Sequence, residues 1–229
     1  MQKPFLIRQF PNMLTLSNLA FGCIGIILAS QGQLEHAAWC IAGGLIADFF
    51  DGFAARLLKV KSDIGGDLDS LSDMVTFGVL PGVIAFQLLA KTDLQPQWLC
   101  FLAFVVTLFS AVRLAIFNND PSQALGFKGV PTPLNALMIG SWPFIAPEYP
   151  EIFQPYVILV TLGVLAWLLV SPLRLMALKF TSFALRDNVL KYLFLLLSGI
   201  SLVLLHFLAV PVIFGLYLLL SIANRSSSR

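Results

Sequence analysis

Charged residues are scarce in this chain of 229 residues. Lys and Arg number 14 and Asp and Glu number 12, so only 11% of the sequence is charged, whereas 58% is hydrophobic. The mean hydropathy is +0.87. This composition excludes an ordinary soluble domain and predicts an all-α, polytopic membrane protein with a single domain. The formal net charge of +2 is too small to indicate a nucleic-acid partner.

Cysteine is also rare, and its number is odd. Cys23, Cys40 and Cys100 all lie in apolar segments, so no disulfide framework is implied, and buried, inert thiols are favoured.

The few acidic residues that exist are not spread evenly. Half of the twelve fall within residues 47–73. Asp48 and Asp51 are three positions apart and Asp69 and Asp73 are four apart, so on helices each pair shares one face. Four converging carboxylates repel one another in an apolar setting unless a cation lies between them. Oxygen ligands favour hard divalent ions, and two such ions can stabilise both oxygens of a phosphoryl transfer.

The same stretch carries a longer motif. Its members, at fixed spacing, are Asp48, Asp51, Gly52, Ala55, Arg56, Gly65, Asp69 and Asp73. This pattern resembles the full signature of the CDP-alcohol phosphotransferases. The resemblance implies an integral membrane enzyme that moves a phosphatidyl-type group from a CDP-linked lipid to an alcohol and releases CMP.

The resemblance also implies roles for individual residues. The four aspartates of the motif are expected to bind two divalent ions, Mg²⁺ or Mn²⁺, and Asp73 is also expected to act as the general base. Asp63 and Asp67 lie outside the signature and are expected to be solvated. The residues expected to bind the CDP-lipid are Asn12, Thr15, Asn18, Asp48, Gly52, Ala55, Arg56, Gly65 and Asp69.

Other stretches are similar to the phosphatidylserine synthase branch of that family. They are a PNxxTxxNxxxG opening at residues 11–22, a DSLSDMVTFGVLP block at 69–81, and the RLAxFN and FKGVPTP blocks at 113–118 and 127–133. Thr76 and Val130 replace a usual serine and leucine, and Ile116 stands where arginine is common. The resemblance implies CDP-diacylglycerol and L-serine as substrates. Arg113 and Lys128 are the candidates for binding the serine carboxylate, with simple membrane anchoring as the alternative.

Other acceptors and other protein classes stay open at this point. Choline would require an aromatic cage, for which Phe49, Phe50, Phe53, Phe77 and Phe117 are available. Glycerol phosphate and inositol phosphate would require a denser basic cluster than this chain offers. A transporter could also line a cation or proton pathway with acids, but it has no need of the rest of the motif. A phosphohistidine route has no paired His-x-Lys motif, because the two histidines, His36 and His206, lack a lysine two positions later.

Hydropathy predicts the membrane arrangement. An interfacial helix is expected over residues 1–11, a six-helix catalytic core over 13–171, and a linker with two extra spans over 172–229. The eight expected spans are 13–30, 36–58, 68–90, 97–117, 133–147, 153–171, 190–206 and 208–224. With both termini cytoplasmic, thirteen of the fourteen basic residues lie on the cytoplasmic side and only Lys91 lies outside. We therefore expect a bacterial-type inner-membrane protein whose site faces the cytosol, and the family resemblance suggests a homodimer.

Overall fold

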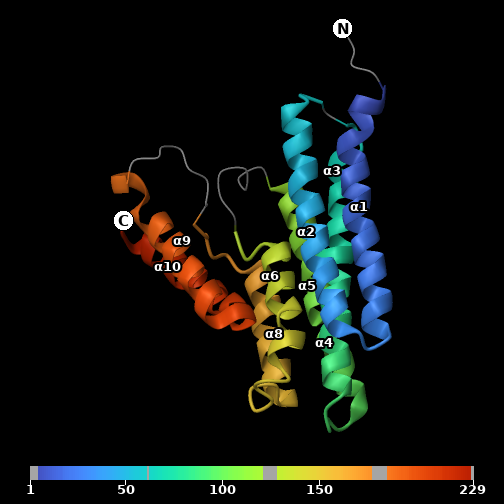
Figure 1. Ribbon diagram of the computed structural model, residues 1–229, viewed down its shortest axis with the longest axis vertical. Coiled ribbons are helices and arrows are strands. Elements are labelled where there is room, and N and C mark those ends of the chain that lie inside the picture. The colour runs from blue at the N-terminus through green and yellow to red at the C-terminus, as the bar shows by residue number, and fades with distance from the viewer. Residues whose placement is uncertain (1–4, 61, 121–127, 177–184, 228–229) are drawn as a thin grey trace.

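The computed structural model describes residues 5–60, 62–120, 128–176 and 185–227, and these are helical apart from short connections. Lys128 and Arg174 form an isolated antiparallel bridge. The elements in chain order are α1 (Phe5–Ser30), α2 (Leu34–Leu57), α3 (Gly65–Asp73), the π-helix η1 (Met74–Val79), α4 (Leu80–Ala90), the 3₁₀ helix η2 (Gln97–Phe104), α5 (Val105–Asn119), α6 (Thr132–Gly140), α7 (Trp142–Ile145), α8 (Pro155–Val170), α9 (Leu185–Leu205), the 3₁₀ turn η4 (His206–Leu208) and α10 (Ala209–Ser227). Figure 1 shows α1 to α8 gathered in one upright bundle, with α9 and α10 leaning away from it.

Among the described residues, five stretches are long and apolar enough to cross a bilayer. They are Gln9–Ser30, Leu34–Leu57, Gly65–Ala90, Gln97–Asn119 and Asn188–Ala223, and α8 is a shorter apolar helix. An all-helical membrane protein is therefore confirmed, whereas the count of eight spans stays a prediction. The expected span 133–147 is divided between α6 and α7, of nine and four residues.

The last of these stretches folds back on itself. His206 has a positive φ of 49°, and the chain reverses there between α9 and α10. Phe194 of α9 and Tyr217 of α10 lie with ring centroids 5.8 Å apart, so the two helices pair as an antiparallel hairpin. The expected spans 190–206 and 208–224 correspond to these two helices.

The N-terminal segment differs from the expectation of a separate interfacial helix over residues 1–11. Residues 5–11 belong to α1, which continues through Pro11 without a break. Pro11 removes one backbone hydrogen bond and its ring crowds the carbonyl four residues earlier, but the helix continues past it. Propagation of a helix already formed is favourable, so one long helix replaces the two that were expected. Residues 1–4 lie outside the described part.

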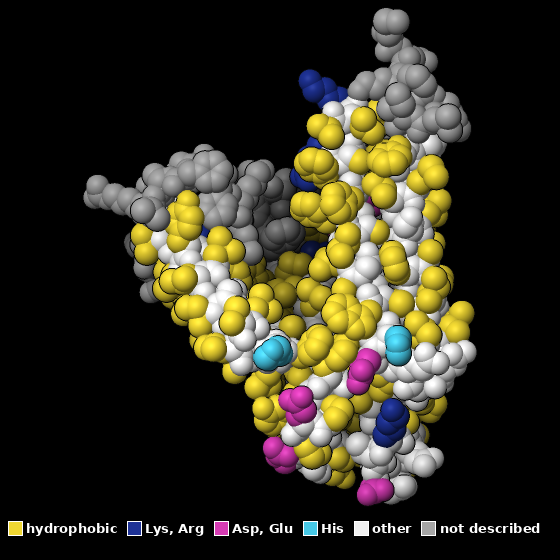
Figure 2. Space-filling model, in the orientation of Figure 1, with side chains coloured by type: hydrophobic (Ala, Val, Ile, Leu, Met, Phe, Trp, Pro, Cys, Tyr) yellow, Lys and Arg dark blue, Asp and Glu magenta, His cyan; other side chains and the backbone are white. Residues whose placement is uncertain are grey.

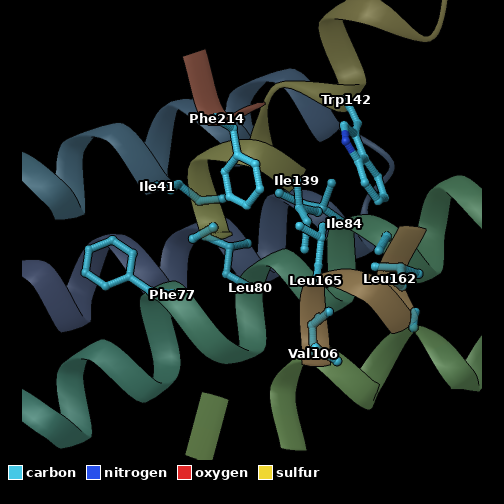
Figure 3. Packing of buried hydrophobic residues seen from close by; sticks show 14 of the residues in the cluster. Ile41, Phe77, Leu80, Ile84, Val106, Ile139, Trp142, Leu162, Leu165 and Phe214 are labelled. Atoms are coloured by element: carbon cyan, nitrogen blue, oxygen red, sulfur yellow. The ribbon is translucent and has the colours of Figure 1, made fainter. Parts of the chain in front are cut away.

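The bundle core lies where α2, α4, α6 and α8 meet. Figure 3 shows Ile41, Leu80, Ile84 and Ile139 converging there, and all four side chains are fully buried. Small residues let the neighbouring helices approach closely. A Cβ added at Gly44 of α2 would lie 2.8 Å from Asn18 Oδ1 of α1. Close backbone approach of this kind is how helices pack within a bilayer, where lipid is as apolar as the core.

The surface agrees with a membrane environment. On the face in Figure 2, hydrophobic side chains dominate and acidic side chains gather toward the lower end. Exposed aliphatic and aromatic residues such as Ile27, Leu108 and Val203 are at least half exposed, which suits contact with lipid tails.

Candidate active site

Three aspartates from two helices form the centre of the site. Asp48 and Asp51 come from α2 and Asp69 comes from α3, and carboxylate oxygens of all three lie within 4.8 Å of one another. Asp51 is buried. No Lys or Arg in the described part of the chain forms an ion pair with them. A set of oxygen donors with this much uncompensated charge fits a hard divalent cation.

Asp73 lies beside this cluster rather than within it. It is one helical turn after Asp69, at the end of α3, and it is buried. The side-chain amide of Asn18 donates a hydrogen bond of 3.1 Å to Asp73 Oδ1. Asp73 also interacts electrostatically with Asp48, Asp69 and Arg113. The structure thus brings three of the four expected metal ligands together. The fourth, Asp73, lies close enough to interact with Asp48 and Asp69 electrostatically.

Helix α1 supports the carboxylates from one side. Thr15 Oγ1 donates a hydrogen bond of 2.6 Å to Asp51 Oδ2, and both residues are buried. Asn12, one turn earlier, donates to Gln9 Oε1 at 2.8 Å and to Ser62 Oγ at 3.1 Å. The expected polar face of Asn12, Thr15 and Asn18 is therefore turned toward α2, α3 and the connector between them.

A cavity of about 280 Å³ opens next to the cluster. It is lined by Pro11, Asn12, Thr15, Asp51, Gly52, Ala55, Val60, Ser62, Gly65, Gly66 and Asp69. Six of the nine expected CDP-lipid residues line it, and Asn18, Asp48 and Arg56 do not. Arg56 is exposed on α2, one residue beyond Ala55. At Gly52 the cavity is open, because a Cβ at this position would meet nothing within 4 Å.

Ser62 was missed by the sequence reasoning. It lies in the connector between α2 and α3, outside the motif, and it meets Asn12 across 50 positions of sequence. No local pattern marks such a contact.

A larger cavity, of about 680 Å³, lies at the opposite ends of α2 and α4. Glu35, His36, Lys91 and Asp93 are among its lining residues, and none of the motif residues lines it. Its walls lack the carboxylate cluster, so we assign the chemistry to the smaller cavity.

The two basic residues expected to bind an acceptor differ from each other. Arg113 is buried on α5, donates to Thr132 Oγ1 at 3.2 Å, and lies 4.8 Å from the centre of the Phe117 ring. Its Nε has no partner among the described residues. Lys128 is instead paired with Asp120, at 2.9 Å from Nζ to Oδ2. Arg113 therefore retains donor capacity, whereas the charge of Lys128 is already matched.

Four of the five phenylalanines considered for a choline cage are divided between the outside of α2 and the buried core. Phe49, Phe50 and Phe53 pack on one another and are 46–62% exposed on the outside of α2. Phe77 is fully buried in the core. These rings do not form the enclosed aromatic box that a quaternary ammonium group requires.

Comparison with known proteins agrees with this geometry. The model of the CDP-alcohol phosphatidyltransferase family matches residues 8–171. The chain is 33% identical to a CDP-diacylglycerol–serine O-phosphatidyltransferase of Helicobacter pylori over 223 residues, which cover 93% of this chain and 89% of that protein. It is 34% identical to the Bacillus subtilis protein of the same name over 133 residues, covering 58% and 74%. An archaetidylserine synthase of Methanothermobacter thermautotrophicus is 28% identical over 152 residues, covering 65% and 63%. The motif, the cavity that it lines and these similarities together show that the chain belongs to the CDP-alcohol phosphatidyltransferase family.

Proposed function

We propose that the protein transfers the phosphatidyl group of CDP-diacylglycerol to the hydroxyl of L-serine, giving phosphatidylserine and CMP. The observation that carries the proposal is the cavity lined by motif residues against the three-aspartate cluster. Similarity along almost the whole chain to proteins named for this reaction supports the choice of substrates.

Asp48, Asp51, Asp69 and Asp73 would hold two divalent ions, Mg²⁺ or Mn²⁺. Such ions, when bound, neutralise charge on the diphosphate and on the leaving CMP. The carboxylates supply hard oxygen donors from two helices, and Thr15 fixes the orientation of the Asp51 carboxylate.

Asp73 would take the proton from the acceptor hydroxyl. The serine oxygen forms a bond to the phosphorus that carries diacylglycerol, and the bond from that phosphorus to the CMP oxygen breaks. Asn18 holds the Asp73 carboxylate through one oxygen, which leaves the other oxygen for the hydroxyl. Asp73 lies one helical turn after Asp69 on α3, so the helix itself positions this base next to the site of charge development.

The remaining motif residues would bind the nucleotide and the diphosphate. Gly52, Ala55 and Gly65 leave space in the cavity wall for the cytidine ring, and Asn12 and Thr15 offer polar atoms beside it. Arg56 lies at the same end of α2 and can donate two parallel hydrogen bonds to a phosphate.

Arg113 would bind the serine carboxylate. It is a buried cation whose Nε has no partner among the described residues, and it interacts electrostatically with Asp73. Lys128, the other candidate, could serve only by giving up its ion pair with Asp120.

Orientation in the membrane follows from the basic residues. We propose that the aspartate cluster faces the cytosol in a bacterial-type inner membrane, with the lipid tails of the substrate remaining in the bilayer. The positive-inside rule supports this orientation. Of the basic residues used for that argument, Lys3, Lys61, Lys179 and Arg229 lie outside the described part. A homodimer packed through its membrane helices is part of the same proposal.

The test is CMP release by purified protein from CDP-diacylglycerol with Mn²⁺, comparing L-serine, choline, glycerol 3-phosphate and inositol phosphate. We expect release with serine, and we expect Asp73→Asn to reduce the rate by about 100-fold or more, since a positioned base contributes at least that much. Asp67→Asn is the matched control, because Asp67 is an exposed residue of the same helix outside the motif. Release with another acceptor alone would overturn the choice of serine.

A further inference from the structure

Helix α6 carries two polar residues on a buried face. Thr132 and Asn135 are three positions apart, and both are 0% exposed. The same face continues with Ala136 and Ile139, which are also fully buried. Asn135 therefore occupies a position where the helical pattern calls for an apolar side chain.

The side-chain amide of Asn135 has no hydrogen-bond partner among the described residues, at either Nδ2 or Oδ1. Its backbone N–H is satisfied by the Pro131 carbonyl at 3.1 Å, so only the side chain is left unpaired. Buried amides in folded proteins are nearly always paired, because burial without a partner is unfavourable. A fully buried amide without a partner among the described residues is a candidate for binding a ligand.

Contacts connect this amide to the acceptor side of the site. Helix α6 packs against α2, η1 and α5, the elements that flank Asp73. Arg113 of α5 donates to Thr132, one turn before Asn135 on the same face of α6. On α5, the buried Arg113 Nε also lacks a partner in the described chain.

A zwitterionic amino acid needs a donor for its carboxylate and an acceptor for its ammonium group. Arg113 can only donate, so it fits the carboxylate and cannot bind the ammonium. The amide oxygen of Asn135 is a neutral acceptor that no described residue occupies.

We propose that Asn135 determines specificity for the acceptor, with its Oδ1 accepting a hydrogen bond from the serine ammonium group while Arg113 binds the carboxylate. This inference rests on the proposed function, and it assigns a residue outside both the aspartate motif and the lining of the 280 Å³ cavity. The acceptor that satisfies it must carry an ammonium group, a carboxylate and a primary hydroxyl within a few bonds of one another.

The experiment compares L-serine with 3-hydroxypropanoate, which keeps the hydroxyl and the carboxylate of serine and lacks the ammonium group. Asn135→Leu, of similar volume, is expected to raise the KM for serine about 10-fold or more, since a hydrogen bond to a charged group is lost. The inhibition constant of 3-hydroxypropanoate and the KM for CDP-diacylglycerol are expected to stay within about threefold of wild type, the scatter normal for contacts of this kind. Asn135→Asp keeps an acceptor oxygen and is expected to retain most of the affinity for serine.

Thermal unfolding separates binding from structure. If the amide serves the acceptor, Asn135→Leu leaves the unfolding temperature unchanged or raises it, because an unpaired polar group is replaced by an apolar one. Ser141→Ala is the control, since Ser141 is a buried residue at the end of α6 whose hydroxyl is already bonded to the Met138 carbonyl. It is expected to leave the KM for serine unchanged.

Two results would overturn the assignment while wild type remains active with serine. One is an unchanged KM for serine in a folded Asn135→Leu protein, and the other is an equal loss of affinity for serine and 3-hydroxypropanoate. Failure of the proposed function looks different, because wild-type protein would then release no CMP in response to serine before any variant is compared.

Discussion

The hydrogen bond from Thr15 to Asp51 offers a sharp test of the metal site. The Thr15 hydroxyl has one proton and two possible acceptors, the Pro11 carbonyl at 3.1 Å and Asp51 Oδ2 at 2.6 Å. The Thr15 hydroxyl therefore donates its proton to Asp51 Oδ2, because that contact is shorter and its acceptor is charged. Thr15 thereby fixes the rotation of one carboxylate of the three-aspartate cluster without touching the reacting atoms.

Thr15→Val removes the hydroxyl and keeps the branched shape of the side chain. A buried hydrogen bond to a charged group contributes about 1.5–3 kcal/mol. Loss of a partner that orients a metal ligand typically lowers metal affinity about 10- to 100-fold. We therefore expect the Mn²⁺ concentration for half-maximal CMP release to rise by about that factor, with much of the rate recovered at saturating Mn²⁺.

The matched control is Thr161→Val. Thr161 lies on α8 and bonds only to the Val157 carbonyl of its own helix, at 2.8 Å. It should leave the Mn²⁺ dependence unchanged. A folded Thr15→Val protein with wild-type Mn²⁺ dependence would refute the idea that Thr15 orients a metal ligand.

Two further predictions concern space and packing. Gly52→Leu should fill the cavity and raise the KM for CDP-diacylglycerol about 10-fold, a penalty in the range found for overpacked sites. Gly163→Leu is the control and should leave this KM unchanged. A Cβ at either glycine meets nothing within 4 Å, so the two substitutions differ only in whether they face the cavity. Equal effects of the two substitutions on KM would argue against the cavity as the lipid-nucleotide site. Ile84→Ala should lower the free energy of unfolding by about 2–5 kcal/mol, measured by unfolding in detergent, because Ile84 is fully buried. Ile27→Ala, at a position 56% exposed, should change it little, and similar losses for both would contradict the assigned core.

The local features of the site could be predicted from the sequence because their information is local. Spacings of three and four residues put Asp48 beside Asp51, and Asn12, Thr15 and Asn18 on one face of α1. Hydropathy likewise located α2 and the segment Gln97–Asn119 to within a few residues. The continuous α1 was not predicted, although the helix runs through Pro11 and joins the expected interfacial segment to the first span.

The remaining features depend on contacts between distant segments. Ser62 meets Asn12 across 50 positions of sequence, a contact that exists only in the folded chain. Asn135 carries no sequence signal of its own, since a lone asparagine in an apolar segment is as compatible with a helix cap or a solvated end. The role proposed for Asn135 depends on its burial and on the lack of a side-chain partner among the described residues, and both are visible only in the folded structure.

The π-helix η1 joins two segments with different tasks. Before it, α3 presents Asp69 and Asp73 to the site, and after it, α4 presents Leu80 and Ile84 to the core. A π segment bonds each N–H to the carbonyl five residues back, one residue further than in an α-helix, so it holds more residues per turn. Each residue of an α-helix turns the side-chain direction by roughly 100°. The segment Met74–Val79 therefore sets a fixed angular offset between the two halves. We expect that removing one residue from this segment would rotate Asp69 and Asp73 relative to Leu80 and Ile84 by roughly 100°.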